Sequence, residues 1–99
     1  MVADREPVTP RLRRFGDLVR EHRHRSGLSQ EALALAAGVN RSYYASLEAG
    51  RRNASLETIS RLALALDCDA ADLVRGLQAL PGRTKQAPEE PMELDPDVK

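Results

Sequence analysis

Apolar residues recur along this chain with the spacing of α-helices and not of β-strands. Ile59, Leu62, Ala63 and Leu66 follow one another at i, i+3, i+4 and i+7, the spacing that places side chains on one face of a helix. No strand-like alternation competes with this helical pattern. The pattern therefore predicts an all-α protein.

Capping residues and glycines divide the pattern into five helices. A Ser, Thr, Asn or Asp side chain caps a helix start by accepting a backbone N–H, and a left-handed glycine often ends the helix. We expect the second helix over residues 30–37, between Ser29 and Gly38, and the third over residues 41–49, between Asn40 and Gly50. Thr9-Pro10 and Gly27 bound the first helix, and Ser55 precedes the fourth. Asp69 and Asp72 form a capping box for a fifth helix, which carries Leu73, Val74, Leu77 and Leu80.

The second and third expected helices form the most informative pair. Only Gly38, Val39 and Asn40 separate them, which is the tight glycine-containing connection of a helix-turn-helix. The second helix is rich in alanine, and small residues let two helix backbones cross closely. We therefore predict a helix-turn-helix motif over residues 30–49.

The third helix has an unusually small outward face. At 100° per residue, Tyr44 and Leu47 lie on its core side with Glu48 on the flank, and the opposite side holds Arg41, Ser42, Ala45, Ser46 and Ala49. A solvated surface is one interpretation of such a face. A DNA major groove is the other, because it admits a helix and because arginine bound to guanine is the commonest specific contact there. The flanks favour the groove, since phosphate strands would pass close to Gln30, Arg51, Arg52 and Asn53.

Two charged residues occupy the apolar sides of their helices. Arg23 lies within the stripe formed by Leu12, Phe15 and Val19, and Glu48 lies beside the core side of the third helix. A buried charge is costly without a partner. We therefore predict an ion pair between Arg23 and Glu48 that fixes the angle of the third helix, the alternative being two independent surface charges.

Composition and charge narrow the function classes. The net charge of zero over 99 residues conceals a region from Arg11 to Leu80 with 11 arginines and 8 acids, a net of +3, followed by an acidic end. The single cysteine, Cys68, argues against a disulfide framework or a thiolate metal cluster, and no apolar run is long enough to cross a membrane. His22 and His24 lie on different faces of the first helix and cannot form a shared site. We expect a cytoplasmic protein with no metal, no cofactor, no enzymatic activity and no indicated small-molecule ligand.

Several motifs together resemble a known family. Arg23 is followed by S-Q-E-A-L-A (29–34), G-V-N-R-S (38–42), L-E-A-G (47–50), R-N-A-S-L-E (52–57) and A-L-A-L (63–66). This series, from about Phe15 to Leu73, is similar to the Cro and phage-repressor type, or xenobiotic-response-element, helix-turn-helix family. The resemblance implies a compact five-helix, λ-repressor-like domain that binds operator DNA, usually as a dimer.

The resemblance also implies roles for individual residues. Gln30 would touch phosphate. Bases or flanking phosphates would be faced by Asn40, Arg41, Ser42 and Ser46, with Arg41 as the lead base reader. Arg23 and Glu48 match the family's ion pair between helices. N-R-S-Y-Y followed by R-R-N is especially similar to restriction-modification controller proteins, in which the positions of Tyr43, Arg52 and Asn53 also approach DNA. Ala49 and Ala54 depart from the family's frequent basic residue and proline. Tyr44 occupies a core position more often filled by Ile or Val, so we expect its hydroxyl to reach the domain edge.

Dimerisation would give the domain enough base contacts for specificity. Leu64, Val74, Leu77 and Leu80 supply apolar surface for it, although Leu77 and Leu80 could instead cover the base of the domain itself. We therefore expect a flexible arm over residues 1–9, the DNA-binding domain over 10–80, and a Pro- and acid-rich disordered tail over 81–99 that is passive or competes with DNA. The alternative function is an antitoxin-like or other protein-binding module with the same fold.

Overall fold

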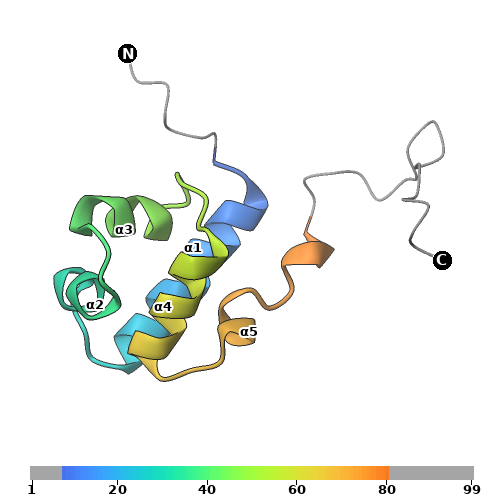
Figure 1. Ribbon diagram of the computed structural model, residues 1–99. Coiled ribbons are helices and arrows are strands. Elements are labelled where there is room, and N and C mark those ends of the chain that lie inside the picture. The colour runs from blue at the N-terminus through green and yellow to red at the C-terminus, as the bar shows by residue number, and fades with distance from the viewer. Residues whose placement is uncertain (1–7, 81–99) are drawn as a thin grey trace, which may run out of the picture.

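The computed structural model describes residues 8–80 as a small helical domain (Figure 1). The expected arm and tail over residues 1–9 and 81–99 fall almost entirely outside the described residues. The elements are α1 (Pro10–Arg25), α2 (Gln30–Ala37), α3 (Arg41–Glu48), α4 (Leu56–Leu66), α5 (Ala70–Leu73) and a short 3-10 helix, η1 (Leu77–Ala79). The described residues contain five α-helices and no strand, so the predicted all-α fold class is confirmed.

Each α-helix begins at the capping residue that the sequence predicted. The Thr9 hydroxyl accepts from the Leu12 amide at 3.1 Å, and the Ser29 hydroxyl accepts from the Ala32 amide at 3.0 Å. Ser55 caps α4 in the same way. Asp69 and Asp72 form the reciprocal capping box of α5. These bonds satisfy amides that have no partner within a helix.

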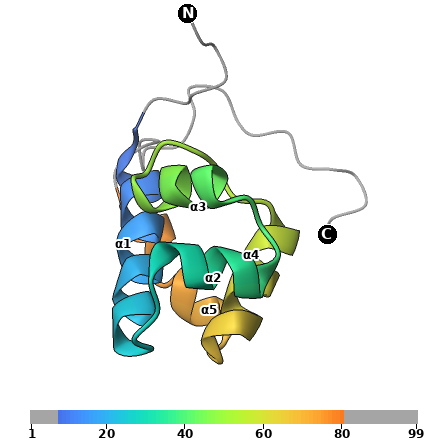
Figure 2. The same ribbon diagram turned by 90° about the vertical axis from the view of Figure 1, so that its left-hand side faces the viewer.

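The core lies where all five α-helices meet. Its fully buried side chains come from each of them: Val19, Leu33, Tyr44, Leu47, Leu62 and Leu73. α2 packs against α3 and α4, while α1 lies against α3 on one side and α5 on the other. Figures 1 and 2 show α2 and α3 together on one side of the domain, with α5 on the opposite side. The predicted helix-turn-helix pair is thus held on the rest of the fold as a platform.

The fifth helix is shorter than the sequence predicted. The apolar spacing from Leu73 to Leu80 suggested one continuous helix, but α5 ends at Leu73 and the chain turns through Gly76, which has φ 78°. Two arginines of α1 bind carbonyls exposed by this break. Arg14 Nε donates to the Arg75 carbonyl at 3.2 Å, and Arg11 Nε donates to the Leu77 carbonyl at 3.1 Å. These contacts replace the helical bonds that a longer α5 would have made.

Candidate nucleic-acid interface

The turn between α2 and α3 is built from the residues that the sequence marked. Gly38 ends α2 in the left-handed conformation, with φ 73° and ψ 32°, which glycine adopts without a steric penalty. Two residues later, the Asn40 side chain accepts from the Tyr43 amide at 3.0 Å and begins α3. α3 ends at Glu48, one residue earlier than expected, with Ala49 as its C-cap.

α3 divides into a buried side and an exposed side, as its helical positions predicted. Tyr44 and Leu47 are fully buried and Glu48 is 5% exposed. On the other side, Arg41 and Ser42 are exposed, and Ser46 is half-buried. The side chains that face outward are therefore one arginine and small residues.

Glu48 is the point at which α3 is attached to the rest of the domain. Arg23 of α1 donates to its carboxylate from Nε at 2.5 Å and from Nη2 at 3.3 Å, so the expected ion pair is present. Gln30 Nε2, at the start of α2, donates to Glu48 Oε1 at 2.9 Å. The Tyr44 hydroxyl donates to Glu48 Oε2 from within α3. Side chains from three helices thus converge on one carboxylate.

The expected position of the Tyr44 hydroxyl was wrong. Tyr44 is fully buried and its hydroxyl binds Glu48 instead of reaching the domain edge. Desolvation, with the neighbouring carboxylate, raises the pKa of Tyr44 far above its usual value, so the phenol remains a donor. The two residues are four apart in α3 and therefore on the same face, which is the sequence signal that would have identified this bond.

The network also determines the charge of Glu48. Desolvation acts to raise the pKa of this carboxyl, but the hydrogen bonds from Arg23, Tyr44 and Gln30 outweigh it and hold the pKa below its ordinary value. The hydrogen bond to Glu48 likewise raises the pKa of Arg23. The pair therefore stays ionised, and the acid of α3 is neutralised on the side away from the exposed face.

α1 approaches the C-terminal end of α3 very closely. A Cβ atom at Gly16 would lie 2.3 Å from the Glu48 carbonyl oxygen, so this position has no room for a side chain. At Gly50, φ is 77° and the Arg51 amide donates to the Ser46 carbonyl at 2.9 Å, closing α3 with a Schellman turn. The chain then emerges with Arg51 exposed.

The segment after α3 is linked back to Tyr43. The Tyr43 hydroxyl donates to the Asn53 carbonyl at 3.3 Å, and the Arg52 guanidinium lies 5.5 Å from the centre of the Tyr43 ring. A cation over an aromatic ring is attracted by the ring quadrupole. Tyr43, Arg52 and Asn53 consequently form one cluster beside the exposed face of α3.

The proposed DNA-contacting residues lie on α2, α3 and the adjoining segments. Exposed residues of the set are Asn40, Arg41, Ser42, Arg51 and Asn53, and half-buried ones are Gln30, Tyr43, Ser46 and Arg52. Sequence reasoning missed the hydrogen bond from Gln30 to Glu48, because a contact between helices is not visible in one helix pattern.

Of the apolar residues assigned to a dimer, Leu64 is 83% exposed, whereas Val74, Leu77 and Leu80 are half-buried. The described residues contain no acidic, His or Cys cluster that could hold a metal, and none of their helices is long and apolar enough to cross a membrane.

Comparison with known proteins identifies the fold family. A family model described as helix-turn-helix matches residues 19–73, more than half of the chain. The chain belongs to the XRE-type helix-turn-helix family. The predicted family is therefore confirmed.

Relatives within the XRE-type family are regulators. The control protein C.BamHI of Bacillus amyloliquefaciens is 39% identical over 61 residues, which cover 61% of this chain and 75% of that protein. The crystal structure of the restriction-modification controller protein C.AhdI from Aeromonas hydrophila is 48% identical with a TM-score of 0.62, over 63% of this chain and 94% of that one. SinR, a master regulator for biofilm formation crystallised in complex with DNA, is 30% identical with a TM-score of 0.58. The match covers 60% of this chain and 95% of the SinR chain. As a member of this family, the protein is a DNA-binding transcriptional regulator and not an enzyme.

Proposed function

We propose that the protein is a homodimeric transcriptional regulator of the controller type, which reads an inverted-repeat operator with α3 in the major groove. The observation that carries this proposal is the division of α3. Its outward side presents Arg41 among small residues, while its one acid, Glu48, is buried and paired with Arg23. A helix of this kind can approach base edges without repelling phosphates.

Arg41 is the leading base reader in this proposal. It is the first residue of α3 and is exposed, and the N-terminal residues of a recognition helix are those that contact base edges. Its planar guanidinium can donate two hydrogen bonds to guanine O6 and N7. Asn40, Ser42, Tyr43 and Ser46 would contact bases or adjacent phosphates, and Gln30, Arg51, Arg52 and Asn53 would contact phosphates.

The dimer supplies the second half-site. Leu64 presents an almost completely exposed apolar side chain on α4, and burying a leucine stabilises an interface by about 1.5–3 kcal/mol. We assign the contact between copies to Leu64 together with Val74, Leu77 and Leu80. Two-fold symmetry then requires two inverted half-sites, and we expect them about 34 Å, or one helical turn, apart along the duplex.

In vitro selection from random DNA at two salt concentrations tests the proposal. The expected product is a symmetric site with two half-sites. Recovery of no consensus, with weak binding that is insensitive to salt, would contradict the proposal and favour a protein-binding module of the antitoxin type.

Arg41→Ala then tests the assigned reader on the selected operator. We expect a loss of about 1–3 kcal/mol and relaxed preference at one base position in each half-site. Arg51→Ala is the matched control, because loss of a phosphate contact weakens binding to all sequences alike. A loss at Arg41→Ala that is equal for operator and scrambled DNA would show that Arg41 does not read bases.

A further inference from the structure

The first turns of α1 carry three arginines with different surroundings. As described above, Arg11 and Arg14 donate to the Leu77 and Arg75 carbonyls and hold the segment after α5 against α1. Arg13 has an exposed side chain, and its guanidinium makes no hydrogen bond or ion pair within the described residues 8–80. Asp17, the acid one turn away, is paired with Arg20 at 2.5 Å.

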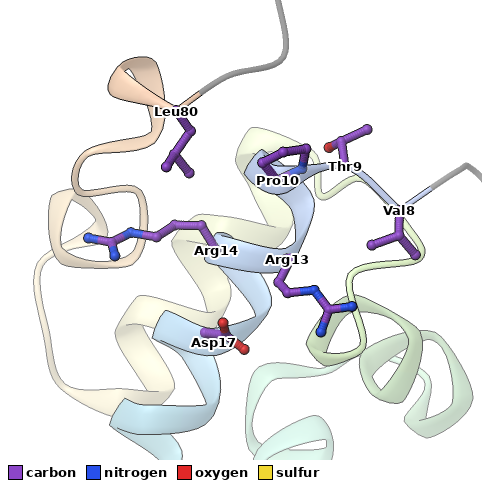
Figure 3. Close-up of a pocket in the computed structure, with 7 residues that line it drawn as sticks. All are labelled: Val8, Thr9, Pro10, Arg13, Arg14, Asp17 and Leu80. Atoms are coloured by element: carbon purple, nitrogen blue, oxygen red, sulfur yellow. The ribbon is translucent and has the colours of Figure 1, made fainter.

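Arg13 and Arg14 also extend to different sides of α1. Figure 3 shows both beside the hollow that they line with Leu80 and Thr9. Arg14 extends toward the segment that ends at Leu80, whereas Arg13 extends toward the other side, where α3 and the segment after it lie (Figure 3). Arg13 therefore takes no part in holding the C-terminal segment.

The backbone of Arg13 lies against the end of the recognition helix. A Cβ atom at Gly50 would be 3.1 Å from Arg13 Cα and 3.2 Å from Arg13 N. Gly50 is followed directly by Arg51 and Arg52. One turn further along α1, Gly16 packs closely on the Glu48 carbonyl. This second contact also fixes the position of α1 along the end of α3. The position of Arg13 relative to α3 is thus fixed by backbone contacts and not by a mobile side chain.

We propose that Arg13 is a further phosphate ligand, on the DNA strand that passes the C-terminal end of α3. This inference rests on the proposed function, in which Arg51 and Arg52 contact that strand. Arg13 adds an exposed cation from a different helix next to the same turn. An arginine can bind a phosphate through two parallel N–H donors. The contact would extend the protein's footprint beyond the helix-turn-helix itself and would carry no sequence information.

The test is the salt dependence of DNA binding by Arg13→Ala, Arg13→Lys and Arg75→Ala. Arg75 is a charge-matched control, because it is paired with Asp72 of α5. α5 lies on the side of the domain opposite α3 (Figure 1). The probes are the operator selected from random DNA and a scrambled duplex of equal length. The slope of log K against log salt is negative, and each lost phosphate contact reduces its magnitude by about 0.9. This change reduces the ratio of the affinities at 50 and 200 mM salt about 3.5-fold. Unchanged thermal unfolding of each variant shows that the fold is intact.

We expect Arg13→Ala to reduce the magnitude of this slope on both probes, while Arg13→Lys and Arg75→Ala keep the wild-type slope. A wild-type slope for Arg13→Ala, in protein that binds its operator and loses specificity with Arg41→Ala, overturns the role of Arg13 and leaves the proposed function standing. Equal slope reductions for Arg13→Ala and Arg75→Ala would assign the effect to net charge and also overturn it. Wild-type protein that selects no operator would contradict the proposed function itself.

Discussion

Replacing Glu48 by glutamine removes the charge at the centre of the network that holds α3. The substitution keeps the size and shape of the side chain. It leaves the Arg23 guanidinium, whose side chain is 10% exposed, without its carboxylate. It also places an amide NH₂ among groups that are all donors, since Arg23, Gln30 and the Tyr44 hydroxyl each donate to the carboxylate.

The expected loss of stability follows from these contacts. Removing one partner of a buried ion pair costs about 3–5 kcal/mol, because the remaining charge is left unpaired in a poorly solvated site. Arg23 keeps its bond from Nη1 to the Leu28 carbonyl at 2.8 Å and the contact of Nη2 with His24 Nε2 at 3.3 Å, so we expect the lower end of this range, about 3 kcal/mol. For a domain of this size, that loss lowers the melting temperature by about 12 °C or more.

Urea unfolding at neutral pH, followed by circular dichroism, measures this change. Glu57→Gln is the matched control, because Glu57 is paired with Arg61 at 3.1 Å on the surface and its side chain is 73% exposed. An exposed pair of this kind contributes about 0.5 kcal/mol or less. A loss below about 1 kcal/mol for Glu48→Gln, or a loss equal to that of Glu57→Gln, would refute the idea that the buried carboxylate anchors α3.

Acid titration gives the same prediction a second readout. The pKa of Glu48 is lower in the folded protein than its ordinary value, so the unfolded state binds more protons in acid. The stabilisation is fully present above the ordinary carboxyl pKa of about 4.3 and is lost as the pH falls through the folded-state value. Wild-type stability should therefore decline in this range more steeply than that of Glu48→Gln, and equal slopes would count against the ionised pair.

Two further substitutions test the dimer and the closeness of α1 and α3. Leu64→Glu should convert the dimer to a monomer in sedimentation equilibrium. Leu35→Glu should not, although Leu35 is 81% exposed and Leu64 is 83% exposed. Equal behaviour of the two variants would exclude Leu64 from the interface. Gly16→Ala should destabilise the domain by about 3 kcal/mol or more in thermal unfolding, since its methyl group would lie 2.3 Å from the Glu48 carbonyl oxygen and a helix of the core would have to move. A change below about 1 kcal/mol would mean that α1 shifts away from α3 easily.

Much of this domain could be predicted from the sequence because its signals are local. A cap such as Asn40 and a left-handed stop such as Gly38 act within a few residues, and both boundaries of α2 were predicted correctly. The pairing of Arg23 with Glu48 was also predictable, although the two are 25 residues apart, because each charge was conspicuous on an apolar helix side.

What could not be predicted depends on contacts between distant segments. The apolar spacing after Leu73 fits a helix, and the break at Gly76 is stabilised by Arg11 and Arg14, more than 60 residues earlier in the chain. The hydrogen bond from Gln30 to Glu48 depends on how α2 and α3 cross, and the pattern of a single helix does not contain that angle. In each case the missing information was a bond from a side chain to a group in another part of the fold.

The two sides of α3 have consequences for how such a protein can change. The residues that hold the helix in place, Tyr44, Leu47 and Glu48, are buried, and Arg41 and Ser42, which are assigned to DNA, are exposed and take no part in the core. Substitutions of Arg41 and Ser42 should therefore change the folding free energy by no more than about 0.5 kcal/mol. If α3 reads the operator as proposed, a gene duplicate could acquire a new operator preference in a few steps without passing through an unstable intermediate. The same separation would make α3 a practical scaffold for regulators with chosen target sites.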